Sequence, residues 1–195
     1  MTALTFGNFL HAFAPIHIVS RSPHHHDPTM QITNHHGHAA LRRGRYSEPG
    51  RNYLITSTTA QRQPLFDDPD IARVAARTLH EQRLWRNSEL LAWVLMPDHV
   101  HLLVRLGDDE SLSRLVARVK TIVARQARQV RATGLPFWSA SFHDHALRHD
   151  EDLLAVARYI IANPVRAGLV RSALDWPFWD CAWLPHAASD LIEAP

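Results

Sequence analysis

Two strand-like segments separated by a Pro-Asp step constrain the fold more than any other part of this sequence. Residues 89–96 and 99–106 are rich in leucine, valine and other apolar residues, and Pro97 and Asp98 stop the first segment. A connection this short joins strands that run in opposite directions. We therefore predict that the two segments form a β-hairpin.

Strand-like and helical patterns alternate on both sides of this hairpin. Further strands are predicted at residues 51–59 and 139–148, and helices at residues 70–85, 111–131 and 151–162. Asp150 is suited to cap the last helix, Pro164 should end or interrupt it, and Gly168 fits a turn after it. Few strands with interleaved helices favour an α+β sandwich, in which helices pack on a mostly antiparallel sheet.

The 195 residues suit one domain with a hydrophobic core and less regular ends. Residues 1–44 contain eight of the fifteen histidines and show little apolar periodicity, so we predict a disordered His-rich extension there. The domain itself is expected at residues 45–184, and a flexible tail at residues 185–195. Metal binding by the N-terminal histidines is the less favoured alternative.

Composition narrows the setting of the protein and its class of partner. The sequence has no run of about 18 apolar residues and no secretory signal, so no membrane-spanning helix is expected. The single cysteine, Cys181, cannot form an internal disulfide, which favours a cytoplasmic location. The net charge is only +2, but Lys120 is the sole lysine, and arginine suits phosphate contacts. A GC-rich genome would give the same arginine bias.

A histidine pair begins the second strand of the hairpin. His99 and His101 flank Val100, so both imidazoles should project from one face of the strand and could share a divalent metal ion. Asp98 is expected to face the opposite side if the strand already includes it. The alternative is a pair of polar residues on a solvated strand face. His143 and His145 form a second such pair, but Asp144 between them gives that strand no buried opposite face.

One of the three tyrosines lies in an amphipathic helix. Tyr159 falls beside the apolar stripe of the last predicted helix, and Asn163 lies four residues later, on the same helical face. A phenol and an amide would then point to one place. The alternative is a tyrosine at the rim of the core, followed by an Asn-Pro step that ends the helix.

The long helix at residues 111–131 has a basic stripe and no acidic residue. Its cationic side chains are Arg114, Arg118, Arg125 and Arg128, with Lys120 nearby. Solvated helix faces usually mix charges, so this asymmetry favours a polyanionic partner over a plain solvent-facing surface. Trp138 could stack on a base of single-stranded nucleic acid, or it could belong to the core.

Three ordered motifs are specific enough to compare with a known family. They are MPDHVHLLV (96–104), FHDHALRHDEDL (142–153) and ARYIIANPVRAGLV (157–170). Together with residues 43–66, they resemble REP-associated tyrosine transposases, which are bacterial relatives of the single-tyrosine HUH transposases of small insertion sequences. The resemblance covers residues 44–184 approximately and implies a ferredoxin-like fold.

The resemblance also implies roles for individual residues. His99 and His101 would bind Mg²⁺ or Mn²⁺, Asn163 would complete the metal site, and Tyr159 would be the nucleophile. His145 would lie behind the metal ligands or contact DNA. The implied activity is cleavage and joining of single-stranded DNA at REP-type hairpins through a 5′-phosphotyrosine intermediate.

Two other functions remain open at this point. A domesticated transposase could bind DNA as a repressor without chemistry, and a metal-dependent hydrolase could use water as its nucleophile. A monomer is expected, although other single-tyrosine transposases act as dimers.

Overall fold

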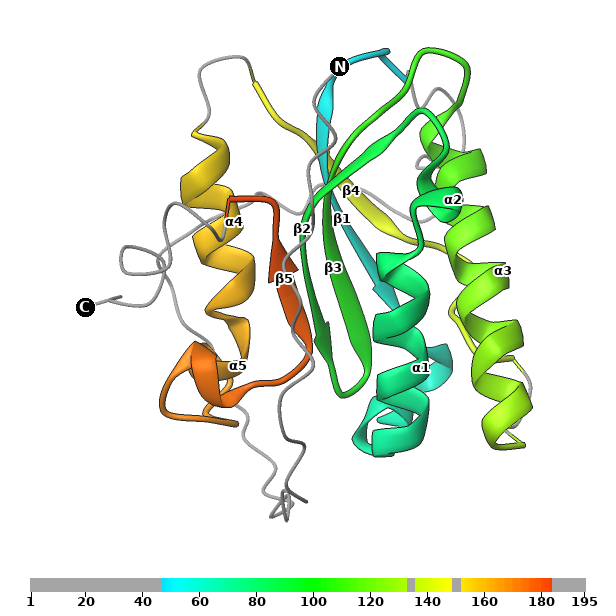
Figure 1. Cartoon of the computed structure of the whole chain (residues 1–195), viewed down its shortest axis with the longest axis vertical. Helices are drawn as coiled ribbons and strands as arrows, with labels where there is room; N and C mark the ends of the chain where they lie inside the picture. The colour runs from blue at the N-terminus through cyan, green and yellow to red at the C-terminus, as the bar shows by residue number, and fades with distance from the viewer. Residues whose placement is uncertain (1–46, 133–135, 149–151, 184–195) are drawn as a thin grey trace. The chain divides into compact units, whose positions relative to one another are not determined.

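Five antiparallel strands form one sheet in the order β4-β1-β3-β2-β5 (Figure 1). The computed structural model describes residues 47–132, 136–148 and 152–183. The strands are β1 (Asn52–Thr58), β2 (Glu89–Met96), β3 (His99–Arg105), β4 (His143–Ala146) and β5 (Trp179–Cys181). The predicted N-terminal extension, the predicted tail and Asp150 lie outside the described residues.

The predicted hairpin is confirmed and forms the middle of the sheet. Strands β2 and β3 pair from Glu89 opposite Arg105 to Met96 opposite His99, and Pro97 and Asp98 make the turn. The other edge of β3 pairs with β1, from Thr58 opposite His99 to Asn52 opposite Arg105. Strand β3 therefore has a neighbour along its whole length on both sides.

The connections between strands give the sheet a ferredoxin-like topology. Helices α1 (Pro69–His80) and α2 (Gln82–Trp85) connect β1 to β2, and α3 (Leu112–Val130) connects β3 to β4. In Figure 1 these helices lie on one side of the sheet, and α4 (Leu153–Ile161) and α5 (Asn163–Arg166) lie on the other. The expected α+β class is confirmed. Strand β5, which extends the sheet beyond β2, was not predicted.

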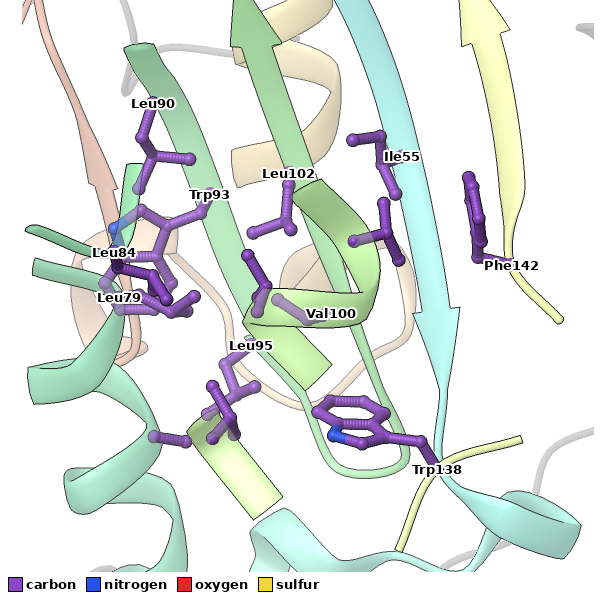
Figure 2. Close-up of a cluster of buried hydrophobic side chains, with 14 of the residues drawn as sticks. Ile55, Leu79, Leu84, Leu90, Trp93, Leu95, Val100, Leu102, Trp138 and Phe142 are labelled. Atoms are coloured by element: carbon purple, nitrogen blue, oxygen red, sulfur yellow. The ribbon is translucent and has the colours of Figure 1, made fainter. Parts of the chain in front are cut away.

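Each face of the sheet has its own hydrophobic core. Ile55, Val100 and Leu102 point toward α1 and α3, and Figure 2 shows them together with Trp138 and Phe142. On the other face, Leu103 of β3 packs with Ile160 of α4. Because neighbouring residues of a strand point in opposite directions, β3 contributes alternate side chains to the two cores.

Several predicted boundaries differ from those observed. The first helix stops at Glu81, whose backbone is extended (φ −70°, ψ 109°), before the short α2. Helix α4 begins after Asp152, which accepts a hydrogen bond from the Leu154 backbone N–H at 2.8 Å. Pro164 lies at the start of α5, where a missing N–H costs no helical hydrogen bond. Gly168 has a φ of +68°, as the predicted turn requires.

The fourth strand is shorter than expected. Only His143–Ala146 pair with β1 as a strand, although residues 139–148 were predicted. Upstream, Trp138 forms an isolated bridge with Thr59, and the Ser139 N–H donates to the Thr58 carbonyl at 3.0 Å. Within the part of the chain that the structure describes, no helix is both long and apolar enough to cross a membrane.

Gly107, just after β3, allows a close approach to the loop before β2. A Cβ atom at this position would lie 2.6 Å from the carbonyl carbon and oxygen of Asn87. Because backbone atoms cannot yield easily, we expect Gly107→Ala to lower the free energy of unfolding by about 1–3 kcal/mol. Urea denaturation would measure this loss.

Gly168→Ala is the matched control, because a Cβ there meets no atom within 4 Å and the only cost is the left-handed backbone. That cost should be roughly 1 kcal/mol. A Gly107→Ala variant as stable as the wild type would contradict the close approach.

Candidate functional site

His99 and His101 project from the same face of β3, as predicted, while Val100 between them is buried in the opposite core. Their Nε2 atoms are 3.1 Å apart, and the ring planes are nearly perpendicular, at 87°. Two nitrogens that lie about 2.1 Å from one metal ion, at right angles, would be about 3.0 Å apart. The spacing of the two imidazoles therefore fits two ligands of one ion.

Each imidazole has a partner for its second nitrogen. His101 Nδ1 lies 2.8 Å from Thr56 Oγ1 on β1, and His99 Nδ1 lies 2.5 Å from Asp98 Oδ1. When both Nδ1–H groups donate, the two Nε2 lone pairs face each other, and a shared cation satisfies both. Strand β3 does not include Asp98, so the orientation expected for a strand residue does not apply; Asp98 lies in the turn before β3 and contacts His99.

The electrostatic environment keeps His101 neutral. Burial, together with the nearby positive charges of His99 and Arg62, lowers the pKa of His101 to about 3. Burial alone would raise the pKa of Asp98, but its hydrogen bond to His99 and the charges of His99 and Arg62 lower it overall. A neutral imidazole is the form that can bind a metal ion, and His101 has this form at physiological pH.

A third ligand is not evident from acidic or thiol side chains. In residues 47–132, 136–148 and 152–183, no three His, Cys, Asp or Glu side chains are grouped to hold a metal ion. Asn163 Nδ2 donates to the carbonyl oxygens of Tyr159 at 3.1 Å and Ile160 at 3.0 Å. The amide nitrogen of Asn163 thus caps the end of α4, and its amide oxygen takes no part in these two hydrogen bonds.

Tyr159 lies in the helix that covers the histidine side of the sheet. It is partly buried against the core that contains Met96 and Leu103, and the Arg166 guanidinium carbon lies 4.6 Å from its ring centroid. Figure 1 shows the C-terminal end of α4 at the same end of the sheet as the β2–β3 turn. Tyr159 and the histidine pair therefore share both a face and an end of the sheet.

The second histidine pair lies on the same face as the first. His143 of β4 is opposite Thr56 of β1, and Thr56 is opposite His101 of β3. Directly opposed residues of antiparallel strands point to the same side. His145 is opposite Leu54 and is exposed on that side as well. The two pairs, which were competing alternatives in the sequence, thus lie on one face of the sheet, and His101 and His143 share a cross-strand row through Thr56.

Three residues proposed as DNA contacts are instead engaged within the protein. Arg118 forms an ion pair with Glu110, both side chains being largely buried, and its Nε donates to the Leu84 carbonyl at 2.8 Å. Lys120 Nζ donates to the carbonyl oxygens of residues 139 and 141. Trp138 is 9% exposed, packs in the core and donates to the Lys120 carbonyl. We therefore remove Arg118, Lys120 and Trp138 from the proposed DNA surface.

The remaining basic stripe lies across the sheet from the histidines. Arg114, Arg125 and Arg128 are exposed on α3, and no ion pair is seen for them among the described residues. Helix α3 packs on the face opposite α4 (Figure 1). A DNA that contacts both surfaces must therefore pass around the sheet rather than lie on one face.

Sequence patterns did not single out Thr56, Arg62 or Arg166. The three residues lie in segments whose patterns were recognised. The contacts that they make with His101, Asp98 and Tyr159 depend on strand register or on the packing of distant elements. The alternation of β1 could have placed Thr56 on one of two faces, but only the pairing with β3 puts it behind His101.

Comparison with known proteins identifies a family. The family model described as "Transposase IS200 like" matches residues 49–163. A REP-associated tyrosine transposase of Escherichia coli K12 is 36% identical over 96 residues, which are 48% of this chain and 54% of that protein. A Haemophilus influenzae protein provisionally given the same name is 33% identical over 102 residues, 46% of this chain and 57% of that protein.

The chain thus spans little more than half the length of these two relatives. A solved structure of a REP-associated tyrosine transposase bound to a REP hairpin is also similar, with a TM-score of 0.57 and 26% identity. That similarity covers 78% of this chain and 87% of the solved one.

The internal role of Arg118 can be tested against an exposed arginine of the same helix. Arg118→Ala leaves the Glu110 carboxylate buried without its partner, so the free energy of unfolding should fall by about 3 kcal/mol. Arg128→Ala, at an exposed position, should change it by less than about 0.5 kcal/mol. Urea denaturation would compare the two variants, and equal stabilities would refute the structural role of Arg118.

Proposed function

Since this chain belongs to the IS200-like transposase family, we propose that it cuts and rejoins single-stranded DNA, with Tyr159 as nucleophile and His99 and His101 as metal ligands. The observation that supports this most directly is the convergence of the two Nε2 atoms, 3.1 Å apart, on the face covered by the helix of Tyr159. A DNA-binding protein without chemistry would need neither feature.

The histidine pair suits a divalent ion such as Mg²⁺ or Mn²⁺. His99 and His101 would supply two nitrogen ligands, and the Asn163 amide oxygen is the proposed third ligand. When bound, the ion would act as a Lewis acid toward a phosphate oxygen. Thr56 and Asp98 hold the two rings from behind, so the ligand nitrogens remain directed at one point.

The proposed chemical step is an exchange of one phosphodiester bond for another. The phenol oxygen of Tyr159 bonds to the phosphorus as the bond from phosphorus to the 3′ oxygen breaks, and the phenol proton leaves for solvent or the departing oxygen. The products are a 5′-phosphotyrosine and a 3′-hydroxyl. Because the new bond keeps the phosphodiester energy, a 3′-hydroxyl can reverse the step and join strands without ATP.

The DNA substrate is proposed to be a hairpin with a single-stranded segment. The similar solved transposase is bound to a REP hairpin, and this chain exposes Arg114, Arg125 and Arg128 along α3. Arginines in a row can contact successive phosphates of a duplex stem. His145, exposed on the histidine side, is the proposed contact for the single strand that approaches the site.

Removal of the phenol oxygen tests the proposed nucleophile. Tyr159→Phe keeps the ring beneath Arg166 and its packing, so folding and hairpin binding should be retained. Formation of a protein–DNA adduct that survives denaturing electrophoresis should be lost completely. The substrate would be an oligonucleotide that folds into an imperfect palindrome taken from DNA beside the gene. An adduct of undiminished yield would show that another residue is the nucleophile.

His99→Ala should also abolish cleavage while binding of the same oligonucleotide stays within a few-fold of wild type. A wild-type protein that binds the hairpin but never forms an adduct would instead support a repressor-like, non-catalytic role. Cleavage without any adduct would support a hydrolase that uses water.

Thr56 offers a test of the metal site that does not depend on catalysis. Thr56→Val keeps the side-chain shape but removes the hydrogen bond to His101 Nδ1, so the ring loses its fixed orientation. We expect Mn²⁺ affinity to fall by roughly 10- to 100-fold, measured by calorimetry. Thr56→Ser, which keeps the hydroxyl, should stay near the wild-type value. Equal affinities for all three proteins would argue against metal binding at His101.

A further inference from the structure

The loop after β1 is fastened directly to the turn that precedes His99. The Thr59 backbone N–H donates to the Asp98 carbonyl at 2.8 Å, and the Phe66 N–H donates to the Pro97 carbonyl at 2.9 Å. The Thr59 hydroxyl lies within hydrogen-bonding distance of the carbonyl oxygens of Asp98 and Gln63. The bonds to Pro97 and Asp98 join residues far apart in sequence and hold the loop against the turn that precedes the histidine pair.

Two consecutive residues of this loop adopt a strained backbone conformation. Gln61 has a φ of 54° and Arg62 a φ of 56°, in the left-handed region that residues with a Cβ rarely adopt. Hydrogen bonds from the Arg62 and Gln63 N–H groups to the Thr59 and Ala60 carbonyls hold this turn. Such strain is maintained where surrounding contacts impose it, and its effect here is to project the Arg62 side chain toward the site.

The Asp98 carboxylate connects Arg62 to His99. Its Nη1 lies 3.2 Å from Asp98 Oδ2, and the other oxygen of that carboxylate contacts His99. The Arg62 side chain is 64% exposed, so its ion pair with Asp98 is screened by water and adds little stability. The guanidinium carries five N–H donors in a planar fork, so it can turn to a phosphate at little cost.

The Asp98 carboxylate beside His99 favours a positively charged partner near any phosphate that approaches. Asp98 lies against His99, with 2.5 Å between Asp98 Oδ1 and His99 Nδ1. A carboxylate so close to an imidazole repels an anion that approaches the pair. The Arg62 guanidinium, already paired with Asp98, is placed to offset that repulsion.

From these contacts we infer that Arg62 binds a phosphate of the single DNA strand beside His99 and His101, exchanging its contact with Asp98 for that phosphate. The inference deepens the proposed function and rests on it for the position of the strand. It gives the loop of residues 59–67 a role in substrate binding, separate from the arginines of α3.

Salt dependence of DNA binding tests this inference without requiring catalysis. The probe is fluorescein-labelled oligothymidine, whose dissociation constant is measured by anisotropy over a range of salt concentrations. Each phosphate contact to a single strand contributes about 0.7 to the slope of log affinity against log salt. Arg62→Ala should therefore reduce the slope by about 0.7 and weaken binding at low salt several-fold.

Arg83→Ala is the matched control, because Arg83 is also exposed and paired with a carboxylate, Glu81, but lies on α2. It should keep the wild-type slope. Arg62→Lys should keep the slope but bind more weakly, because lysine retains the charge and loses the planar fork. If Arg62→Ala folds poorly, the comparison of Arg62→Lys with the wild type still tests whether the guanidinium contributes to DNA binding. A wild-type slope in Arg62→Ala, or equal losses in Arg62→Ala and Arg83→Ala, would overturn the inference.

The Mn²⁺ affinity of Arg62→Ala distinguishes a role of Arg62 in DNA binding from a role in positioning Asp98 alone. If Arg62 acts only by holding Asp98 against His99, Arg62→Ala should weaken Mn²⁺ binding and leave the slope unchanged, which would refute the inference. The expected result is the reverse, with unchanged Mn²⁺ affinity and a smaller slope. Failure of the wild type to form a covalent adduct would refute the proposed function, while the slopes would still decide the role of Arg62.

Discussion

The pairing of β3 with strands on both of its edges is the constraint on which the site depends. Two-sided pairing fixes the register of β3, and a shift by one residue would exchange its two faces. Burial of Val100 and Leu102 against α1 and α3 therefore forces His99 and His101 to the other face. The core thus determines the direction of the imidazoles, and the same register brings Thr56 behind one of them.

The sheet also separates the two surfaces to which we assign the proposed chemistry and the proposed binding of the DNA stem. The histidines and Tyr159 are associated with the α4 face, whereas the exposed arginines of α3 lie on the opposite face. A long duplex stem and a single strand differ enough in shape to engage different surfaces. Arg62 lies at the end of the sheet that carries the β2–β3 turn, because it forms an ion pair with Asp98 of that turn.

Local patterns predicted what depends on local structure. The hairpin limits, the long helix capped by Ser111 and the common face of His99 and His101 follow from periodicity and turn chemistry. The link between Tyr159 and the histidines came from resemblance, since no spacing rule relates a helix to a strand so far away. The proposed DNA contact at Arg118 was wrong for a related reason. The helical stripe that contains Arg118 has no acidic residue, but Glu110, just before the helix, forms an ion pair with Arg118.

The Asp98 carboxylate, next to the proposed metal ligands, has two opposite effects on the site. It fixes His99 in one orientation, yet the same negative charge opposes the phosphate that the site must admit. A neutral acceptor would remove the repulsion but orient the imidazole less strongly. A nearby exposed cation resolves the conflict, because it neutralises Asp98 in the absence of DNA and can pair with phosphate in its presence. The strained turn at Gln61 and Arg62 is understandable on this basis, since it places that cation where the carboxylate requires one.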